Sequence, residues 1–77
     1  MTPMPRFRTV EVLLNNGILR YDVQQRDTVY SLRQQIAYYP GIPFNQQMLF
    51  LHHELLDDCR QFFNIPSTCQ LRLRILV

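Results

Sequence analysis

Lysine is absent from this sequence, and all eight of its basic residues are arginine. Lysine is ordinarily among the commonest residues and is the target of acylation and ubiquitination. Its absence excludes an internal lysine as the attachment site for such groups. Both chance in a short chain and selection against modification would explain it. The net charge of +2 is small and the arginines are spread along the chain, so the charge does not indicate a nucleic-acid-binding protein.

Cysteine is scarce, and long apolar runs are missing. Cys59 and Cys69 are the two cysteines, fewer than a small secreted disulfide scaffold usually carries. We expect both to be free thiols, with Cys69 in the core. The apolar runs are too short to span a bilayer, and the first residues lack the apolar stretch of a signal peptide. These absences predict a soluble protein of the cytoplasm, the nucleus or both.

No group of residues indicates catalysis, a cofactor or a metal. Adjacent histidines on a turn cannot easily face one ion, so His52 and His53, with three acids nearby, predict a solvated turn. Cys59 with His53 lacks an oxyanion-binding device and an orienting carboxylate. Residues 15–17, Asn-Asn-Gly, lack the glycine run and following helix of a phosphate loop. We therefore expect a protein that is not an enzyme and binds no cofactor.

The chain length predicts one small domain that opens with a β-hairpin. Residues 1–7, with two prolines, predict an irregular lead-in, and residues 8–77 the domain itself. Apolar side chains alternate over residues 9–14 and again over residues 19–23, as in half-buried strands. The Asn-Asn-Gly sequence between them favours a tight hairpin turn, because Asn and Gly tolerate positive φ.

One amphipathic helix follows the hairpin. Thr28 is the expected N-cap, with its hydroxyl accepting a hydrogen bond from an amide of the first turn. The apolar stripe consists of Val29, Leu32 and Ile36. The helix should end near Tyr38 or Tyr39, because Pro40 restrains the preceding residue and Gly41 suits the exit. We expect the helix tyrosines to cover the edge of the core; a second contact surface is the alternative.

Three further strands complete the pattern. Residues 46–51 alternate, and a turn leads from them to a short strand at residues 55–56. A loop with at most one helical turn follows, and residues 69–77 form a last strand with an apolar and a cationic face. One helix and one sheet predict an α+β fold, with the helix packed on one face of a mixed four- to five-stranded sheet. If the first and last strands pair at its centre, this sheet is a β-grasp.

Several motifs in order and spacing resemble the ubiquitin family. The most specific is Gly41-Ile42-Pro43, followed by Gln46-Gln47, directly after the amphipathic helix. The other matching residues are Asp27-Thr28-Val29, Ile36, Asn45, Leu49, Leu56-Asp57-Asp58, Arg60, Asn64-Ile65, Ser67-Thr68 and Leu71-Arg72-Leu73-Arg74. The resemblance covers Val10 to Arg74, and it implies a ubiquitin-like β-grasp domain.

This resemblance also implies a protein-binding surface on the sheet. In ubiquitin an apolar patch holds most receptors, and its central isoleucine corresponds to Phe50 here. The hairpin leucine of that patch corresponds to either Leu13 or Leu14, because this hairpin is one residue shorter. The predicted protein-binding residues are Leu13, Leu14, Met48, Phe50, His53, Gln70, Arg72 and Arg74. Arginines at the rim would favour a partner with acidic residues around an apolar anchor.

The end of the sequence departs from the ubiquitin pattern. Arg74 is followed by Ile75-Leu76-Val77, where ubiquitin-type modifiers carry the Gly-Gly needed for activation. The resemblance therefore implies a monomeric, non-conjugating domain that docks its host protein on a proteasome subunit, a ubiquitin-binding domain or a ubiquitin-pathway enzyme. No nucleic-acid or membrane partner is expected. The alternatives are a covalent modifier that needs unusual processing, or a structural or GTPase-binding module that uses a strand edge with Arg8 or Arg20.

Overall fold

The computed structural model describes residues 7–15, 17–66 and 70–76. Residues 1–6 of the predicted lead-in and the expected core position of Cys69 lie outside the described residues. The elements in chain order are β1 (Phe7–Leu14), β2 (Gly17–Gln24), α1 (Val29–Tyr38), η1 (Phe44–Gln46), β3 (Gln47–Leu51), β4 (Glu54–Leu55), η2 (Phe62–Asn64) and β5 (Leu71–Ile75). β1 thus includes Phe7, which pairs with Gln24 and lies one residue before the predicted start of the domain.

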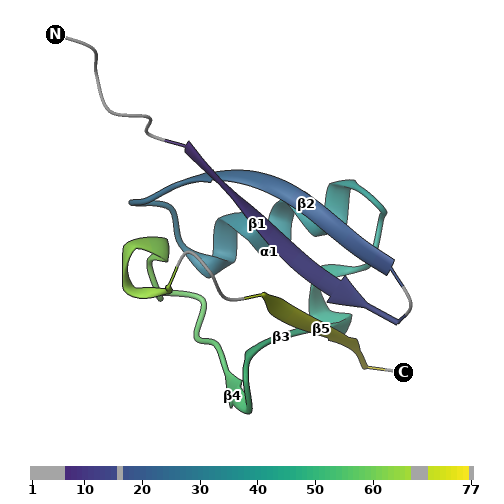
Figure 1. Ribbon diagram of the computed structural model, residues 1–77. Coiled ribbons are helices and arrows are strands. Elements are labelled where there is room, and N and C mark those ends of the chain that lie inside the picture. The colour runs from purple at the N-terminus through teal and green to yellow at the C-terminus, as the bar shows by residue number, and fades with distance from the viewer. Residues whose placement is uncertain (1–6, 16, 67–69, 77) are drawn as a thin grey trace, which may run out of the picture.

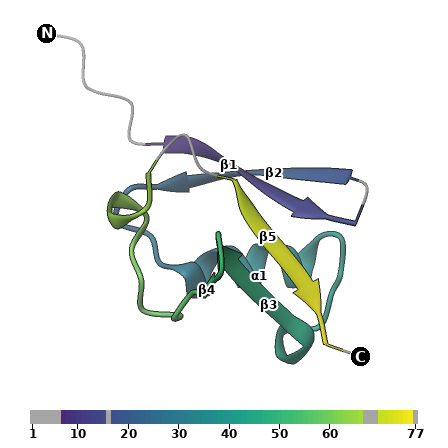
Figure 2. The ribbon, with the colours of Figure 1, turned by 60° about the horizontal axis from the view of Figure 1, so that its bottom comes forward.

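The strands form one mixed sheet in the order β2-β1-β5-β3-β4 (Figure 1). β1 and β5 are parallel neighbours at its centre, with Val12 opposite Leu71, and the other pairs are antiparallel. α1 lies across one face of this sheet, as the two views show (Figures 1 and 2). The predicted α+β β-grasp, including the central pairing of the first and last strands, is confirmed.

The core fills the space between α1 and the sheet. The alternation of side chains predicted for the hairpin and for β3 is observed, since neighbouring buried residues within β1, β2, β3 and β5 are two positions apart. The helix contributes the expected stripe of Val29, Leu32 and Ile36, all fully buried. Each such side chain stabilises the fold by about 1.5–3 kcal/mol relative to an exposed one. The sheet therefore has one face committed to the core and one face open.

The N-terminus of α1 is capped by the backbone of a distant loop, which the sequence did not predict. Thr28 has the extended conformation of an N-cap, but its hydroxyl makes no capping hydrogen bond, so that part of the prediction was wrong. The amides of Val29 and Tyr30 donate instead to the carbonyls of Arg60 and Asp58, at 2.9 and 3.1 Å. These carbonyls satisfy amides that have no partner within a helix.

Two arginines hold the loops to this framework. Arg8 of β1 donates to the carbonyls of Phe62, Ile65 and Pro66 at 2.7–3.1 Å. Arg33 of α1 bonds Asp58 at 2.7 Å and the carbonyls of Phe44 and Gln47, and its guanidinium lies 3.9 Å from the centre of the Phe44 ring. Arg8 is therefore a structural residue. Its guanidinium is already bonded to loop carbonyls, which disfavours the strand-edge binding mode that would use Arg8.

The short strand and the helix lengths differ little from expectation. β4 comprises Glu54 and Leu55, one residue earlier than predicted, because the side chain of Leu56 turns into the core and its amide donates to the carbonyl of Leu49. α1 has ten residues and is the longest helix of the described part. No helix among the described residues is long and apolar enough to cross a membrane.

Candidate protein-binding surface

One line of side chains crosses the open face of the sheet, with one member from each strand. The strand register places Ile18 opposite Leu13, Leu13 opposite Arg72, Arg72 opposite Phe50 and Phe50 opposite Leu55. Directly opposed residues share a face of the sheet. We call these five residues the central row. Four of them are apolar, and an arginine occupies the middle.

The central row is accessible to a partner. Its outer members Ile18 and Leu55 are 42% and 55% exposed, and Arg72 is exposed between them. Leu13 and Phe50 are half-buried. Scattered single apolar residues are ordinary on a protein surface, but apolar residues gathered beside polar ones are a feature of binding surfaces.

The hairpin leucine that joins this surface is Leu13. Leu13 faces outward beside Arg72, whereas Leu14 packs against the core cluster. The hairpin explains the difference, because Leu14 pairs directly with Gly17 and fixes the register. Asn15, one of the two residues between them, has a φ of 53°. Side chains alternate along a strand, so neighbouring leucines take opposite faces.

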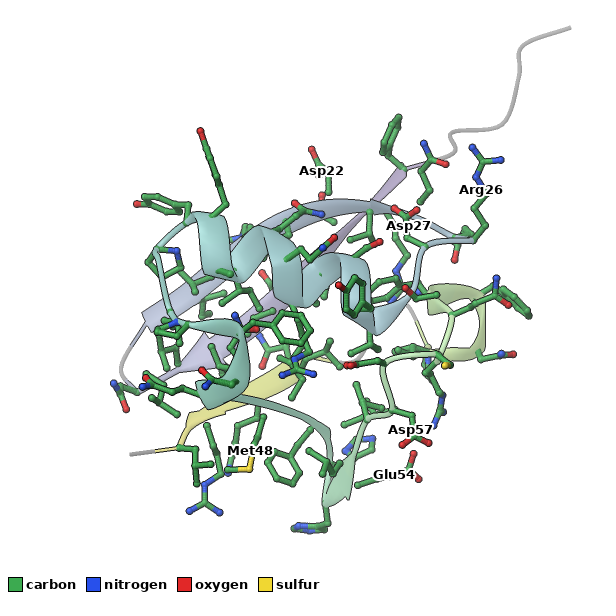
Figure 3. The ribbon with its side chains drawn as sticks, turned by 180° about the vertical axis from the view of Figure 1, so that it is seen from behind. Asp22, Arg26, Asp27, Met48, Glu54 and Asp57 are labelled. Carbon is green, nitrogen blue, oxygen red and sulfur yellow. The ribbon has the colours of Figure 1, made fainter. Side chains whose placement is uncertain are left out.

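Met48 and Arg74 lie beside the central row, on the side toward the hairpin turn. They pair with each other across β3 and β5, two residues along from Phe50 and Arg72. Met48 projects from β3 away from α1 (Figure 3). Where β5 runs on past the end of β1, a shallow depression of about 370 Å³ is lined by Leu13, Asn15, Arg72, Leu73 and Arg74. The predicted Met48, Phe50, Arg72 and Arg74 are therefore brought together on one face.

A closed polar network borders the other side of the central row. The Gln70 amide donates to Glu11 at 2.9 Å, and Arg20 donates to the other oxygen of the same carboxylate at 3.2 Å. The hydrogen bond from Gln70 and, after it, the charge of Arg20 lower the pKa of Glu11. Gln70 lies at the predicted surface, but its amide is already engaged by Glu11.

Arg72 and Arg74 differ from the structural arginines, because neither has a partner in the described part of the chain. Within residues 7–15, 17–66 and 70–76, no hydrogen bond or ion pair involves either guanidinium. His53, the remaining predicted residue, is exposed on the turn between β3 and β4. The open face thus carries positive charge among apolar side chains, with no ion pair to another described residue.

Sequence reasoning did not include Ile18, Leu55 or Glu11 in the surface. Ile18 and Leu55 complete the central row at its two ends, and Glu11 holds Gln70. The hairpin register could have indicated Ile18, since a two-residue turn places it opposite Leu13. The position of Leu55 depends on the pairing of β4, whose start was predicted one residue too late.

The face of α1 turned away from the core carries exposed tyrosines. Tyr38 and Tyr39 are 90% and 69% exposed, so the expectation that they cover the edge of the core was wrong. Tyr21 is the tyrosine buried there, and its hydroxyl donates to the carbonyl of Tyr39 at 2.7 Å. A groove of about 630 Å³ between α1 and β2 is lined by Arg20, Tyr21, Ser31, Gln34, Gln35, Tyr38 and Tyr39.

Near β4, two acidic side chains form ion pairs and one cysteine is exposed. Glu54 pairs with Arg60, and Asp58 pairs with Arg33. Cys59 is a free, exposed thiol. In the described part of the chain, no group of three or more His, Cys, Asp or Glu residues could hold a metal ion.

Comparison with solved structures identifies the fold of this chain. The N-terminal ubiquitin-like domain in the 4931431F19Rik protein superimposes with a TM-score of 0.81 at 15% identity, over 100% of this chain and 82% of that chain. Caldiarchaeum subterraneum ubiquitin gives a TM-score of 0.80 at 13% identity, over 92% of this chain and 95% of that chain. No protein-family model matches the sequence, and no match was found among curated proteins. The chain has the ubiquitin-like β-grasp fold.

Proposed function

We propose that this domain is a non-catalytic protein-interaction module, which docks its host protein on a receptor of the ubiquitin pathway. The candidate receptors are a proteasome subunit, a ubiquitin-binding domain or a ubiquitin-pathway enzyme, in the cytoplasm, the nucleus or both. The observation that carries the proposal is the central row, a line of four apolar side chains around Arg72 on the open face of a ubiquitin-like sheet. Phe50 and Met48 supply the aromatic and polarisable contacts typical of binding surfaces.

The Phe50→Ala variant tests this proposal. Phe50 is half-buried on the open face and contributes little to the core, so the variant should fold. We expect its affinity for a receptor that binds the unmodified domain to fall at least about tenfold, as for a central aromatic anchor. Titration calorimetry against a panel of proteasome receptors, ubiquitin-binding helices and ubiquitin-pathway enzymes gives the affinities.

Phe63→Ala is the matched control. Phe63 is 60% exposed on η2, outside the central row. Its replacement should leave receptor binding unchanged. Equal receptor affinities for Phe50→Ala and the unmodified domain would show that the open face is not the docking surface.

A covalent modifier has less support in the structure. Ile75 pairs with Gln47, and the amide of Leu76 donates to the carbonyl of Gln46 at 2.7 Å. Ile75 and Leu76 are thus bound to the sheet. A thioester assay with activating enzymes should give no product.

A GTPase-binding or structural module that uses a strand edge also has less support. Arg8 is bonded to three loop carbonyls and Arg20 to Glu11, so neither arginine of that mode is unpaired.

A further inference from the structure

The chemistry of the central row narrows the kind of partner. Building on the proposed function, we infer that the open face binds an amphipathic helix that crosses the strands along the central row and carries an acidic residue in the middle of its apolar stripe. The acidic residue pairs with Arg72. Three observations carry the inference: the strand pairing on both sides of the three inner members of the row, the spacing of the row, and a guanidinium at its centre that has no partner among the described residues.

A helix fits this face better than an extended peptide. At the central row, Leu13 of β1, Arg72 of β5 and Phe50 of β3 each have a paired strand on both sides, so this line across the face presents side chains to a partner. An extended peptide laid on it would leave its own amides and carbonyls without partners. A helix pairs these groups internally and needs only side-chain contacts from its receptor.

The spacing of the row matches one stripe of a helix. Neighbouring strands are about 4.8 Å apart, so the five members of the row span about 19 Å. A helix rises about 1.5 Å per residue, so its positions i, i+3, i+7, i+10 and i+14 lie at roughly 0, 4.5, 10.5, 15 and 21 Å along one face. The third position of this stripe falls opposite the third member of the row, which is Arg72.

The charge of Arg72 makes this third position selective. Binding of a helix would remove water from the guanidinium, which has no hydrogen-bond partner among the described residues. An apolar residue at i+7 would leave it desolvated and unpaired, whereas a carboxylate would form a charge-assisted hydrogen bond. The surface therefore favours helices with a central acid and disfavours helices with an uninterrupted apolar stripe.

The charges on the two sides of the row favour further acidic residues on one side of the bound helix. Arg74 adds positive charge on the Met48 side, whereas the Glu11 carboxylate lies on the other side, already bonded to Gln70 and Arg20. Additional acids of the partner are therefore stabilised on the Met48 side, whereas on the other side the charge of Arg20 is already compensated by Glu11.

Two synthetic peptides of 21 residues test the inference. Both carry leucine at i, i+3, i+10 and i+14 in an alanine- and glutamine-rich helix, and they differ only in glutamate or glutamine at i+7. Titration calorimetry against the whole domain at 50 mM salt should show at least about tenfold tighter binding of the glutamate peptide, a difference that decreases at 500 mM salt.

Variants of the domain identify the arginine responsible. Arg72→Gln should remove the preference for glutamate, so that the glutamate and glutamine peptides bind the variant with equal affinity. Arg72→Glu should prefer a third peptide with lysine at i+7. Arg26→Gln is the control, because Arg26 is exposed at the opposite end of the molecule from Met48 (Figure 3). Arg26→Gln should bind each peptide with the same affinity as the unmodified domain.

The possible failures are distinguishable. Equal binding of the glutamate and glutamine peptides would overturn the acidic preference. Binding of neither peptide, together with receptor binding that depends on Phe50, would overturn the helical partner and leave the proposed function intact. Receptor binding that does not depend on Phe50 would overturn the proposed function itself.

Discussion

The arginines of this chain fall into two sets that the sequence alone does not distinguish. Arg8 and Arg33 are bonded to loop carbonyls and hold the fold together. Arg72 and Arg74 lie on the open face without a described partner. A planar guanidinium with five donors can bond several carbonyls at once, which an ammonium cannot do in the same geometry. Arginine at positions 8 and 33 thus has a structural reason that is independent of any avoidance of lysine.

Tyr21 gives a prediction that depends on pH. Burial, followed by the nearby Tyr39, raises the pKa of the Tyr21 phenol above its ordinary value of 10.0. The folded state therefore favours the neutral phenol, which stabilises the domain below pH 10 and loses this effect as the pH rises further. Tyr21→Phe removes the hydrogen bond to the Tyr39 carbonyl and should cost about 1 kcal/mol at pH 7.

Urea denaturation at pH 7 and through pH 9–11 measures this effect. The stability difference between Tyr21→Phe and the unmodified domain should narrow above pH 10, because the variant has no phenol to ionise at that site. Tyr38→Phe is the control, since Tyr38 is 90% exposed and its replacement should change neither value. A difference that widens with pH would contradict the assignment.

At the scale of elements, the exit from α1 depends on one glycine. Gly41 has a φ of 98°, and its amide donates to the carbonyl of Ile36. No atom lies within 4 Å of a Cβ built on Gly41, so a substitution there meets backbone strain and no steric clash. We expect Gly41→Ala to lower the free energy of unfolding by about 1–2 kcal/mol.

Gly17→Ala is the matched comparison, and chemical denaturation measures both variants. Gly17 begins β2 and pairs with Leu14, and a Cβ there would make only an ordinary contact at 3.8 Å with the Leu14 carbonyl oxygen. Its replacement should change stability by less than about 0.5 kcal/mol. Similar losses in the two variants would mean that backbone conformation is not the cause.

Periodicity predicted most elements, because the hairpin, α1 and β3 each bury one face of a local pattern. It did not predict the capping of α1, since the carbonyls of Asp58 and Arg60 approach Tyr30 and Val29 from about thirty residues away. The central row was predicted only in part for the same reason. Its membership depends on pairing between strands that are distant in sequence, and alternation within one strand contains no information on that pairing.

For the molecule as a whole, the two faces of the sheet have different roles. One face and α1 enclose the core, whereas the open face holds the surface for which we propose a partner. The absence of lysine bears on the proposed role, because a domain that docked its host near ubiquitin ligases would be exposed to modification. Selection against modification of lysine would then explain why the sequence has none.

Ubiquitination in vitro tests that explanation. With an activating enzyme, a conjugating enzyme and a ligase of broad specificity, we expect no ubiquitin on any residue from 7 to 76. The Arg26→Lys variant should accept ubiquitin at its introduced lysine, because position 26 is exposed. Mass spectrometry locates the modified residues. The opposite result is that the domain with its original sequence is ubiquitinated at residues 7–76 as efficiently as Arg26→Lys is. In that case the absence of lysine does not protect the domain.

The central pairing of β1 with β5 also bears on when the domain can form. Glu11 and Gln70, which are bonded beside this pairing, lie 59 residues apart in sequence. Contacts between such distant residues require closure of a long loop, and they make folding slower than local contacts do. During synthesis the hairpin and α1 can form early, but the sheet gains its middle strand only when β5 leaves the ribosome. A truncated chain that ends before Leu71 would therefore lack the strand that joins the two halves of its sheet.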